Sequence, residues 1–267
     1  MALLSSPDPQ FLLHLSRRNC PNPKLLLRNP NLRVSCCSSG QLRLATKEAV
    51  TIDSSQLRIK EFLTDSELYA AVRLRIRTFY EFRESYGVEE LRRALTEREY
   101  EGLNDRISGN LVSFKRVACI NATLPISGSL ISAEGLCSEC KFIEDGKERV
   151  VVGTLDLNQC LWLPDELTGR RPEQVSGSNL MRAYISNVCV AKELQRNGLG
   201  FKLINKSKDL ARVWGITDLY VHVAIDNEGA QKLYEKCGFV YESEEPAWKA
   251  RFLGRTRRFL LWTDLKN

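Results

Sequence analysis

The 267-residue sequence lacks several features that identify common classes of protein. Its apolar runs fall well short of the ~18 residues that a membrane-spanning helix needs, so we expect no membrane span. The nine cysteines are scattered rather than spaced as a disulfide framework. Cys137-Ser-Glu-Cys140 is the one C-x-x-C pair, and without a second pair or nearby histidines it predicts no metal site. We expect this pair to have no role or to be redox-sensitive.

Acidic residues are almost absent from residues 1–46, where Asp8 stands against six basic residues. Serines and prolines are scattered through this stretch, and it has no apolar core of the kind that a secretory signal needs. The composition predicts an organellar transit peptide over residues 1–46. Val34-Ser-Cys36 resembles a plastid processing site, so we expect cleavage near residues 36–46 and delivery to the chloroplast stroma. A disordered cytosolic arm and a mitochondrial address are the alternatives.

Most of the net positive charge belongs to that N-terminal segment. The chain has 39 basic and 33 acidic residues, a net charge of +6, and the first 46 residues contribute +5 of it. The remainder is nearly neutral, which argues against a nucleic-acid partner. A basic cluster near the C-terminus, beside Trp248 and Phe252, is expected to be solvated charge on a loop or edge strand. Its members are Lys249, Arg251, Arg255, Arg257 and Arg258.

Hydrophobic periodicity predicts an α+β fold with a mixed, mostly antiparallel sheet in one domain over residues 57–264. Helices are expected over residues 65–83, 88–106, 198–213 and 227–237. Strands are expected over residues 57–62, 111–122, 149–158, 181–190, 217–224, 239–244 and 257–264. Two insertions interrupt this order, at residues 124–147 and 159–179, and the second includes a loop at 163–178.

The stretch from Asn187 to Gly200 predicts a short apolar strand, a polar turn and a helix opened by glycines. The first N–H groups of a helix lack intrahelical partners and lie at the positive end of its dipole. Gly198 and Gly200 leave room for a pyrophosphate there, and Gln195 and Arg196 add donors beside it. The spacing matches neither a Walker loop nor a dinucleotide-binding turn, so we predict an anion site of another kind.

A second block, residues 219–239, predicts a buried strand followed by an amphipathic helix. Asp226 or Asn227 can cap this helix. Ala230 and Tyr234 are four residues apart and therefore share a face, so we expect the tyrosine to point inward. A buried tyrosine hydroxyl needs a partner and can donate a proton, so Tyr234 is a candidate acid.

Both blocks resemble the signatures of the GCN5-related N-acetyltransferases, the GNAT family. Gln195-Arg-Asn-Gly-Leu-Gly200 matches the family pattern [QR]-x-x-G-x-[GA], and residues 227–239 match its N-x-x-A-x-x-[LF]-Y-x-x-x-G-F ending. The likeness covers about residues 57–264 and implies the GNAT fold, acetyl-CoA as co-substrate and no metal. The residues that it implies for binding acetyl-CoA are Val188, Cys189, Val190, Gln195, Arg196, Asn197, Gly198, Leu199, Gly200, Asn227, Glu228, Gly229 and Tyr234.

The resemblance also implies direct transfer of the acetyl group to an amine. In the family, the tyrosine at the position of Tyr234 protonates the departing thiolate, and the strand edge at 188–190 offers an N–H to the thioester oxygen. Tyr184 and His222 resemble in position the two residues that act as general bases in one type of protein N-terminal acetyltransferase. An imidazole changes charge near neutral pH, which suits a base. A hydrogen-bonded core histidine is the alternative for His222.

Residues 161–200 look like the plant plastid group of the family. That likeness implies an N-acetyltransferase of plastid proteins that modifies N-terminal α-amino groups, lysine ε-amino groups or both, with proteins or peptides as acceptor partners. A small-amine enzyme, for an arylalkylamine or a polyamine, is one alternative. A non-catalytic acyl-CoA-binding regulator is another, and the intact Tyr234 argues against it. In this interpretation the insertions at 124–147 and 159–179 border the acceptor side.

Overall fold

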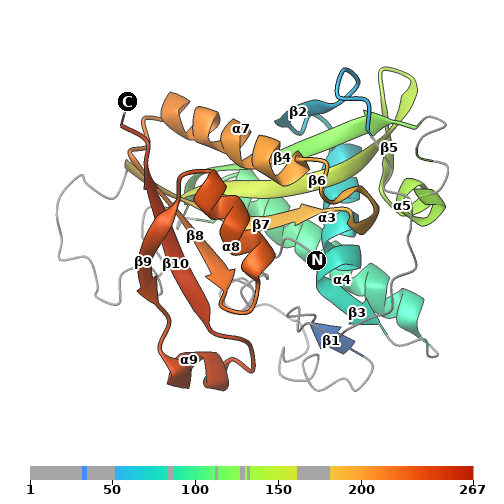
Figure 1. Cartoon of the computed structure of the whole chain (residues 1–267). Helices are drawn as coiled ribbons and strands as arrows, with labels where there is room; N and C mark the ends of the chain where they lie inside the picture. The colour runs from blue at the N-terminus through green and yellow to red at the C-terminus, as the bar shows by residue number, and fades with distance from the viewer. Residues whose placement is uncertain are drawn as a thin grey trace.

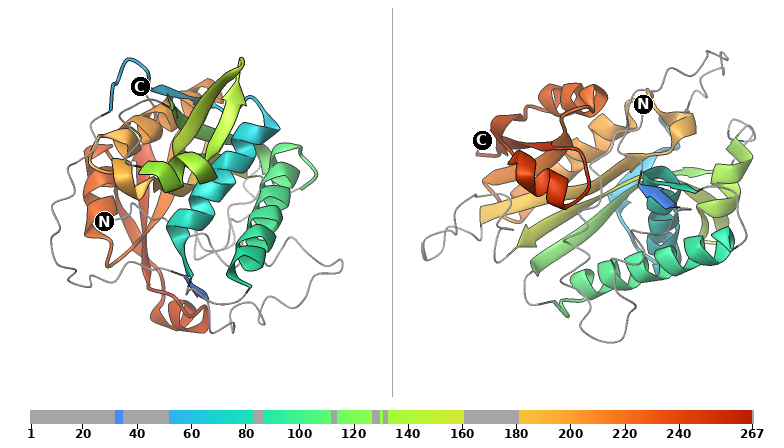
Figure 2. Two further views of the ribbon diagram at one scale, coloured as in Figure 1. Left: turned by 90° about the vertical axis from the view of Figure 1, so that its right-hand side faces the viewer. Right: turned by 90° about the horizontal axis from the view of Figure 1, so that it is seen from below.

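The computed structural model describes residues 32–34, 52–82, 87–111, 114–126, 130, 133–160 and 181–266. The predicted transit peptide, apart from residues 32–34, lies outside the described residues, and so does the expected loop at 163–178. The domain is built on an eight-stranded sheet with helices on both faces (Figures 1 and 2).

The strand order in this sheet is β2-β4-β6-β7-β8-β10-β9, and β5 pairs with β6 beside that path. The strands are β2 (Arg58–Glu61), β4 (Phe114–Pro125), β5 (Lys141–Glu144), β6 (Lys147–Cys160), β7 (Arg182–Val190), β8 (Asp218–Ala224), β9 (Val240–Glu244) and β10 (Arg258–Asp264). Among the described strands of this sheet, β7 and β8 are parallel and the other neighbouring pairs are antiparallel. The predicted mixed, mostly antiparallel α+β fold is therefore confirmed.

The helices are α3 (Asp65–Phe79), α4 (Val88–Ile107), α5 (Glu134–Glu139), α7 (Leu199–Val213), α8 (Glu228–Lys236) and α9 (Ala247–Phe252), with a 3-10 turn η3 (Lys192–Leu194). Figures 1 and 2 show α3 and α4 on one face of the sheet and α7 and α8 on the other. Thr64 caps α3 by accepting the Glu67 N–H at 3.2 Å, and the helix buries Leu68, Val72 and Ile76. No helix in these described ranges is long and apolar enough to span a membrane.

Gly153 lets α7 pack closely on the sheet. A Cβ built at this position would lie 2.9 Å from Leu203 Cδ1 and 3.3 Å from the Cys189 carbonyl oxygen, so a larger residue would crowd the Leu203 side chain and the backbone of β7. Gly153 pairs with Val190, the last residue of β7. The helix is thus fixed directly over the strand end that precedes the predicted anion turn.

The prediction of a helix over residues 65–83 extends the helix beyond its observed end. α3 ends at Phe79, and Tyr80 has extended dihedral angles, with φ at −114° and ψ at 136°. Tyr80–Phe82 form β3, which pairs antiparallel with β1 (Leu32–Val34) in a separate two-stranded sheet. Aromatic residues favour extended backbone, and the partner strand lies far away in the sequence, so helical periodicity could not locate this end.

Two strands, at both of their ends, and one insertion also differ from the prediction. β4 begins at Phe114 and continues to Pro125, whereas the pattern predicted residues 111–122. β6 is longer than the predicted 149–158 at both ends. The insertion at 124–147 holds α5 and β5, and β5 extends the sheet by pairing with β6.

The basic cluster near the C-terminus is solvated only in part, since Arg251 is exposed and the Arg257 side chain is 39% exposed, whereas two other members are buried. Part of it lies in the helix α9, and the side chains of Arg255 and Arg258 are 5% and 3% exposed. Both terminal nitrogens of Arg255 donate to the carboxylate of Glu245 at 2.6 Å. This pairing joins the end of β9 to the residues before β10, and local composition cannot show it.

Candidate active site

The parallel strands β7 and β8 part toward their C-terminal ends. Their pairing runs from Arg182 and Asp218 to Ile185 and Val221. β7 then continues to Val190 and β8 continues to Ala224. An opening of this kind leaves strand edges with which an extended ligand can pair.

A hollow of about 280 Å³ lies beside this opening, between α7 and α8. Its lining comes from the end of β7, the turn after it, the first turn of α7 and one side of α8. The lining residues are Val190, Gln195, Arg196, Gly198, Leu199, Gly200, Phe201, Gly229, Lys232, Leu233 and Lys236. The fold therefore brings the two sequence blocks together at one site.

The turn between β7 and α7 has a backbone shape that suits an anion. Arg196 and Gly198 have positive φ angles of 69° and 74°. Gly198 is the residue before α7, and a Cβ built on it would meet nothing within 4 Å. The Asn197 amide donates to the Leu194 carbonyl at 3.2 Å and braces the turn. The first N–H groups of α7 have no acceptor within the helix, and they border the hollow.

The hollow is positively charged. Arg196, Lys232 and Lys236 line it, and its described lining includes no Asp or Glu. The Lys236 ammonium also lies 5.2 Å from the ring centroid of Phe201. Lys232 forms a 3.9 Å ion pair with Glu228, but both side chains are exposed, so this pair holds the ammonium weakly. A glycine-walled turn with three cations fits a ligand that carries several phosphates.

Lys232 and Lys236 were missed in the sequence. They lie four residues apart on the helix that carries Tyr234, and this spacing is the signal that could have revealed them. Of the thirteen residues predicted to bind the co-substrate, seven line the hollow: Val190, Gln195, Arg196, Gly198, Leu199, Gly200 and Gly229. The other six, which are not in its lining, are Val188, Cys189, Asn197, Asn227, Glu228 and Tyr234. Among these, Asn227 caps α8 by accepting the Ala230 N–H at 3.1 Å.

Tyr184 and His222 meet at the point where β7 and β8 part. The Tyr184 hydroxyl lies 3.0 Å from His222 Nδ1, and their rings pack edge to face at 5.7 Å between centroids. Tyr184 pairs with Tyr220, and His222 is the first β8 residue beyond the last parallel pair. Both side chains are buried, at 7% and 4% exposure. A histidine oriented by a tyrosine at a strand opening can exchange a proton with a bound group.

The face on which this pair lies follows from strand register. Tyr184 pairs with Asn158, which is two residues from Asp156 on β6, so the three side chains leave the sheet on the same face. Arg75 of α3 bonds to Asp156. Tyr184 and His222 therefore lie on the face that α3 covers, opposite the face with the positive hollow.

Tyr234 lies on the inner side of α8. It is 1% exposed, and its ring packs edge to face on Phe239 at 5.7 Å. Ala230, one helical turn earlier, is buried with it. The structure thus places Tyr234 against the sheet beside the hollow-lining residues Gly229 and Leu233.

β7 carries a bulge just after Tyr184. Thr154 and Asp156 of β6 pair with Cys189 and Ser186 of β7, so one strand advances by two residues where the other advances by three. Asn187 lies within this bulge with a φ of 55°. Sequence patterns did not predict this bulge, because a positive φ at asparagine has no distinctive local pattern.

The buried cysteines near the site are poor nucleophiles. Burial raises the pKa of the Cys119 and Cys189 thiols to about 12, so both remain protonated. Cys137 and Cys140 are free thiols, and burial raises the pKa of each. In the described part of the chain, no group of three or more His, Cys, Asp or Glu residues is placed to hold a metal.

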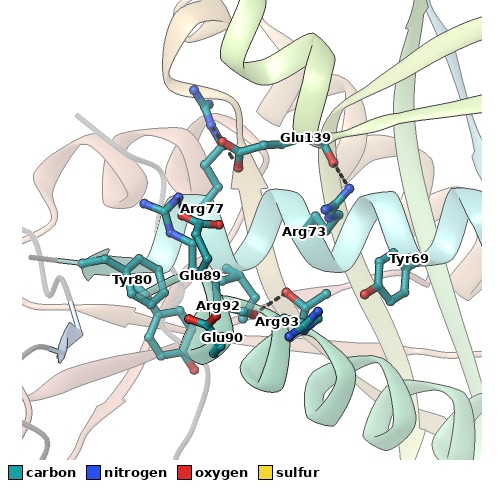
Figure 3. A pocket seen from close by; sticks show the side chains of 12 residues that line it. Tyr69, Arg73, Arg77, Tyr80, Glu89, Glu90, Arg92, Arg93 and Glu139 are labelled. Carbon is teal, nitrogen blue, oxygen red and sulfur yellow. Dashed lines mark hydrogen bonds and ion pairs between the residues drawn. The ribbon is translucent and has the colours of Figure 1, made fainter. Parts of the chain in front are cut away.

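A larger hollow of about 710 Å³ lies between α3, β3 and α4 (Figure 3). Tyr69, Tyr80 and Phe82 contribute aromatic surface to it. Its charged lining is mixed, with Arg73, Arg77, Arg92 and Arg93 against Glu89, Glu90 and Glu139. Arg77 also bonds to Glu193 of η3 at 2.6 Å, which links this hollow to the turn that leads into α7.

The comparisons with known proteins that follow all indicate the same family. Residues 132–239 match the acetyltransferase (GNAT) family. GCN5-related N-acetyltransferase 7, chloroplastic, of Arabidopsis thaliana is 57% identical over 218 residues, which cover 81% of this chain and 79% of that protein. GCN5-related N-acetyltransferase 6, chloroplastic, of the same plant is 31% identical over 190 residues, covering 67% of this chain and 60% of that one.

Among solved structures, an N-acetyltransferase from Staphylococcus aureus is 14% identical with a TM-score of 0.47, and the match covers 79% of this chain and 99% of that one. The decisive likeness is the one at 57% identity, which extends over most of both proteins. Together with the matched family region, it shows that this chain belongs to the GCN5-related N-acetyltransferases and is an N-acetyltransferase.

Proposed function

We propose that the enzyme uses acetyl-CoA to acetylate protein amines in the chloroplast stroma, at N-terminal α-amino groups, lysine ε-amino groups or both. The observation that carries this proposal is the Tyr184–His222 pair at the β7–β8 opening, with the positive hollow on the opposite face. The chloroplastic relatives and the acid-poor residues 1–46 support the location.

The positive hollow has the chemistry to hold the phosphates of coenzyme A. The N-terminus of α7, with Gly198 and Arg196, would hold the pyrophosphate. Lys232 and Lys236 would neutralise further phosphate charge from the α8 side. The parted edge of β7 would pair with the extended pantetheine arm. Bound in this way, acetyl-CoA supplies an acetyl group activated as a thioester.

The residues at the opening would then move protons for a direct transfer. The amine nitrogen bonds to the acetyl carbon while the bond from that carbon to sulfur breaks. His222, oriented by Tyr184, would take the proton that the amine loses, and Tyr234 would give a proton to the thiolate. The Cys189 thiol, protonated with a pKa of about 12, does not offer an acyl-enzyme route.

We take the larger hollow, which Arg77 links to the turn before α7, as the acceptor side, and its mixed charge supports a protein acceptor over a polyamine. Its four arginines outnumber its three glutamates, so a polycation would meet no excess of negative charge. A polypeptide can use both signs of charge and the aromatic surface as well. A small amine remains the second candidate, because the spermidine N(1)-acetyltransferase of Vibrio cholerae is 33% identical over 99 residues, or 36% of this chain.

Mass spectrometry of a bacterial proteome in which the chain is expressed tests the acceptor class. We expect new acetyl groups on protein N-termini or lysines, and we expect a Tyr234→Phe control to remove them. Acetylation of added spermidine with an unchanged proteome would replace this proposal by the small-amine candidate. Binding of acetyl-CoA without transfer to either acceptor would favour a regulator.

A further inference from the structure

The bulge in β7 depends on an unusual backbone angle that a side chain fixes. Asn187 has a φ of 55°, in the left-handed region that residues other than glycine rarely adopt and that asparagine and aspartate tolerate best. The residue is 7% exposed, and its side-chain amide donates to Asp156 Oδ2 at 2.8 Å. The side chain therefore ties the strained residue to the neighbouring strand β6.

Asp156 is the centre of this contact and is fully buried. Arg75 binds both of its oxygens, with Nη1 to Oδ2 at 3.0 Å and Nη2 to Oδ1 at 2.7 Å. Arg106 of α4 approaches Oδ2 at 3.5 Å. With Asn187 as a further donor, the carboxylate is held from both helices and from β7.

Arg75 also spans the bulge from the β6 side. Besides Asp156, it donates to Thr154 Oγ1 at 2.9 Å. Thr154 and Asp156 are the two β6 residues that pair on either side of Asn187. Burial alone would lower the pKa of Arg75, but the Asp156 carboxylate more than offsets this and raises it, so the guanidinium stays charged.

Stability alone does not explain this arrangement. Removing a carboxylate and two guanidinium groups from water costs free energy that their attraction often fails to offset, and apolar residues could fill the same space. The position of the bulge offers a better reason. Asn187 lies two residues beyond Ile185, the last β7 residue paired with β8, so the bulge faces the opening.

We infer that Arg75, Asp156 and Asn187 form a buried clamp that fixes the β7 bulge and thereby positions the strand edge at 188–190, whose N–H the family likeness assigns to the thioester oxygen. This inference rests on the proposed use of acetyl-CoA. The three side chains are positioning residues, because they act through the backbone of β7. Stabilisation of a developing oxyanion depends on donors that are already in place, so a small change in the bulge would lower the transfer rate.

The test uses the full chain with Asn187→Ala, Asn187→Gly and Asp156→Asn. Alanine removes the amide and keeps the disfavoured φ, whereas glycine removes the amide and adopts this φ freely. Asn121→Ala is a matched control, since Asn121 is fully buried on β4 and its amide donates to Glu67 Oε1 at 3.0 Å. Asn121 pairs with Thr154 and accepts from Cys119 Sγ, so the control removes a buried bond of the same neighbourhood while leaving the contact between Asp156 and Asn187 in place.

The main measurement is the infrared carbonyl stretch of bound acetyl-CoA labelled with ¹³C at the thioester carbon. We expect a shift to lower wavenumber in the parent, a smaller shift in Asn187→Ala and Asp156→Asn, and the parental shift in Asn121→Ala. The acetyl transfer rate should fall roughly 10- to 100-fold in the two clamp variants, while the affinity for free CoA changes little. If Asp156→Asn does not fold, Asn187→Gly takes its place and should also show a smaller shift.

Three results would overturn the clamp. These are a parental carbonyl shift in every clamp variant, an equal loss of shift in Asn121→Ala, or a carbonyl at its free frequency in the parent. A parent that does not bind acetyl-CoA is a different outcome, because it removes the proposed function and the clamp inference with it. A parent that shows the carbonyl shift but acetylates no protein would refute the proposed protein acceptor and leave the clamp supported.

Discussion

Gly198 offers the sharpest test of the anion turn, because two substitutions there differ in a single charge. Gly198→Gln and Gly198→Glu place side chains of the same size at a residue with a φ of 74°. The Cβ of either side chain meets no atom within 4 Å, and the two side chains have the same shape, so any steric effect is shared by the pair. The left-handed conformation costs each variant about 1–2 kcal/mol of folding stability, and this cost is common to the pair.

The difference between the two variants is electrostatic. Two unit charges 4 Å apart repel by about 1 kcal/mol in water and by about 4 kcal/mol at an effective dielectric constant near 20. A pyrophosphate carries roughly two charges, so even the aqueous limit gives about 2 kcal/mol, or about 30-fold weaker binding for Gly198→Glu than for Gly198→Gln. The true difference should exceed this limit because the hollow is partly enclosed.

Isothermal titration with acetyl-CoA measures this difference directly. We expect the gap between the two variants to narrow as salt is added, since ions screen charges near the surface. Circular dichroism should match for the pair, and Gly198→Glu should unfold at no lower temperature than Gly198→Gln, because its carboxylate lies at the positive N-terminus of α7. Equal affinities of the folded Glu and Gln variants at low salt would show that the phosphates bind elsewhere.

Three further predictions concern the proposed acid, the proposed base and the cellular location of the protein. Tyr234→Phe should lower kcat by roughly 10²–10⁴-fold with little change in acetyl-CoA affinity, because the buried ring still packs; an unchanged kcat would rule out the acid role. His222→Ala should slow kcat/KM most at low pH, where the amine is protonated, and the deficit should shrink as pH rises; a deficit independent of pH would point to a structural role. A fluorescent fusion of residues 1–50 should enter chloroplasts, and cytosolic or mitochondrial fluorescence would remove the plastid assignment while leaving the enzyme assignment intact.

The parts of the site that sequence could predict are those encoded by neighbouring residues. The turn at Gln195–Gly200 and the helix that carries Tyr234 are local patterns, and their glycines and apolar spacing are visible in one line of letters. Tyr184 and His222 were proposed as bases by resemblance of position alone. The structure shows that they also contact each other, at 3.0 Å, at the strand opening.

The parts that sequence could not predict depend on pairs of residues far apart in the chain. Arg75 and Asp156 are separated by 81 positions, and each sits in an ordinary helical or strand pattern. The end of α3 at Phe79 is set by pairing of β3 with β1, and the burial of Arg255 is set by Glu245. Hydrophobic periodicity shows which face of an element is buried, but it does not show which charged residue of a neighbouring element contacts that face.

β7 is the element on which both halves of the site depend, and it is held from two faces by different means. On one face, Gly153 allows Leu203 of α7 to pack over the strand end that leads into the anion turn. On the other face, Asp156 fixes Asn187 in the bulge. A strand constrained in both directions can keep a left-handed residue that a free strand would relax. Because the anion turn is formed by local glycines and the bulge by distant charges, loosening the bulge should slow acetyl transfer while phosphate binding persists.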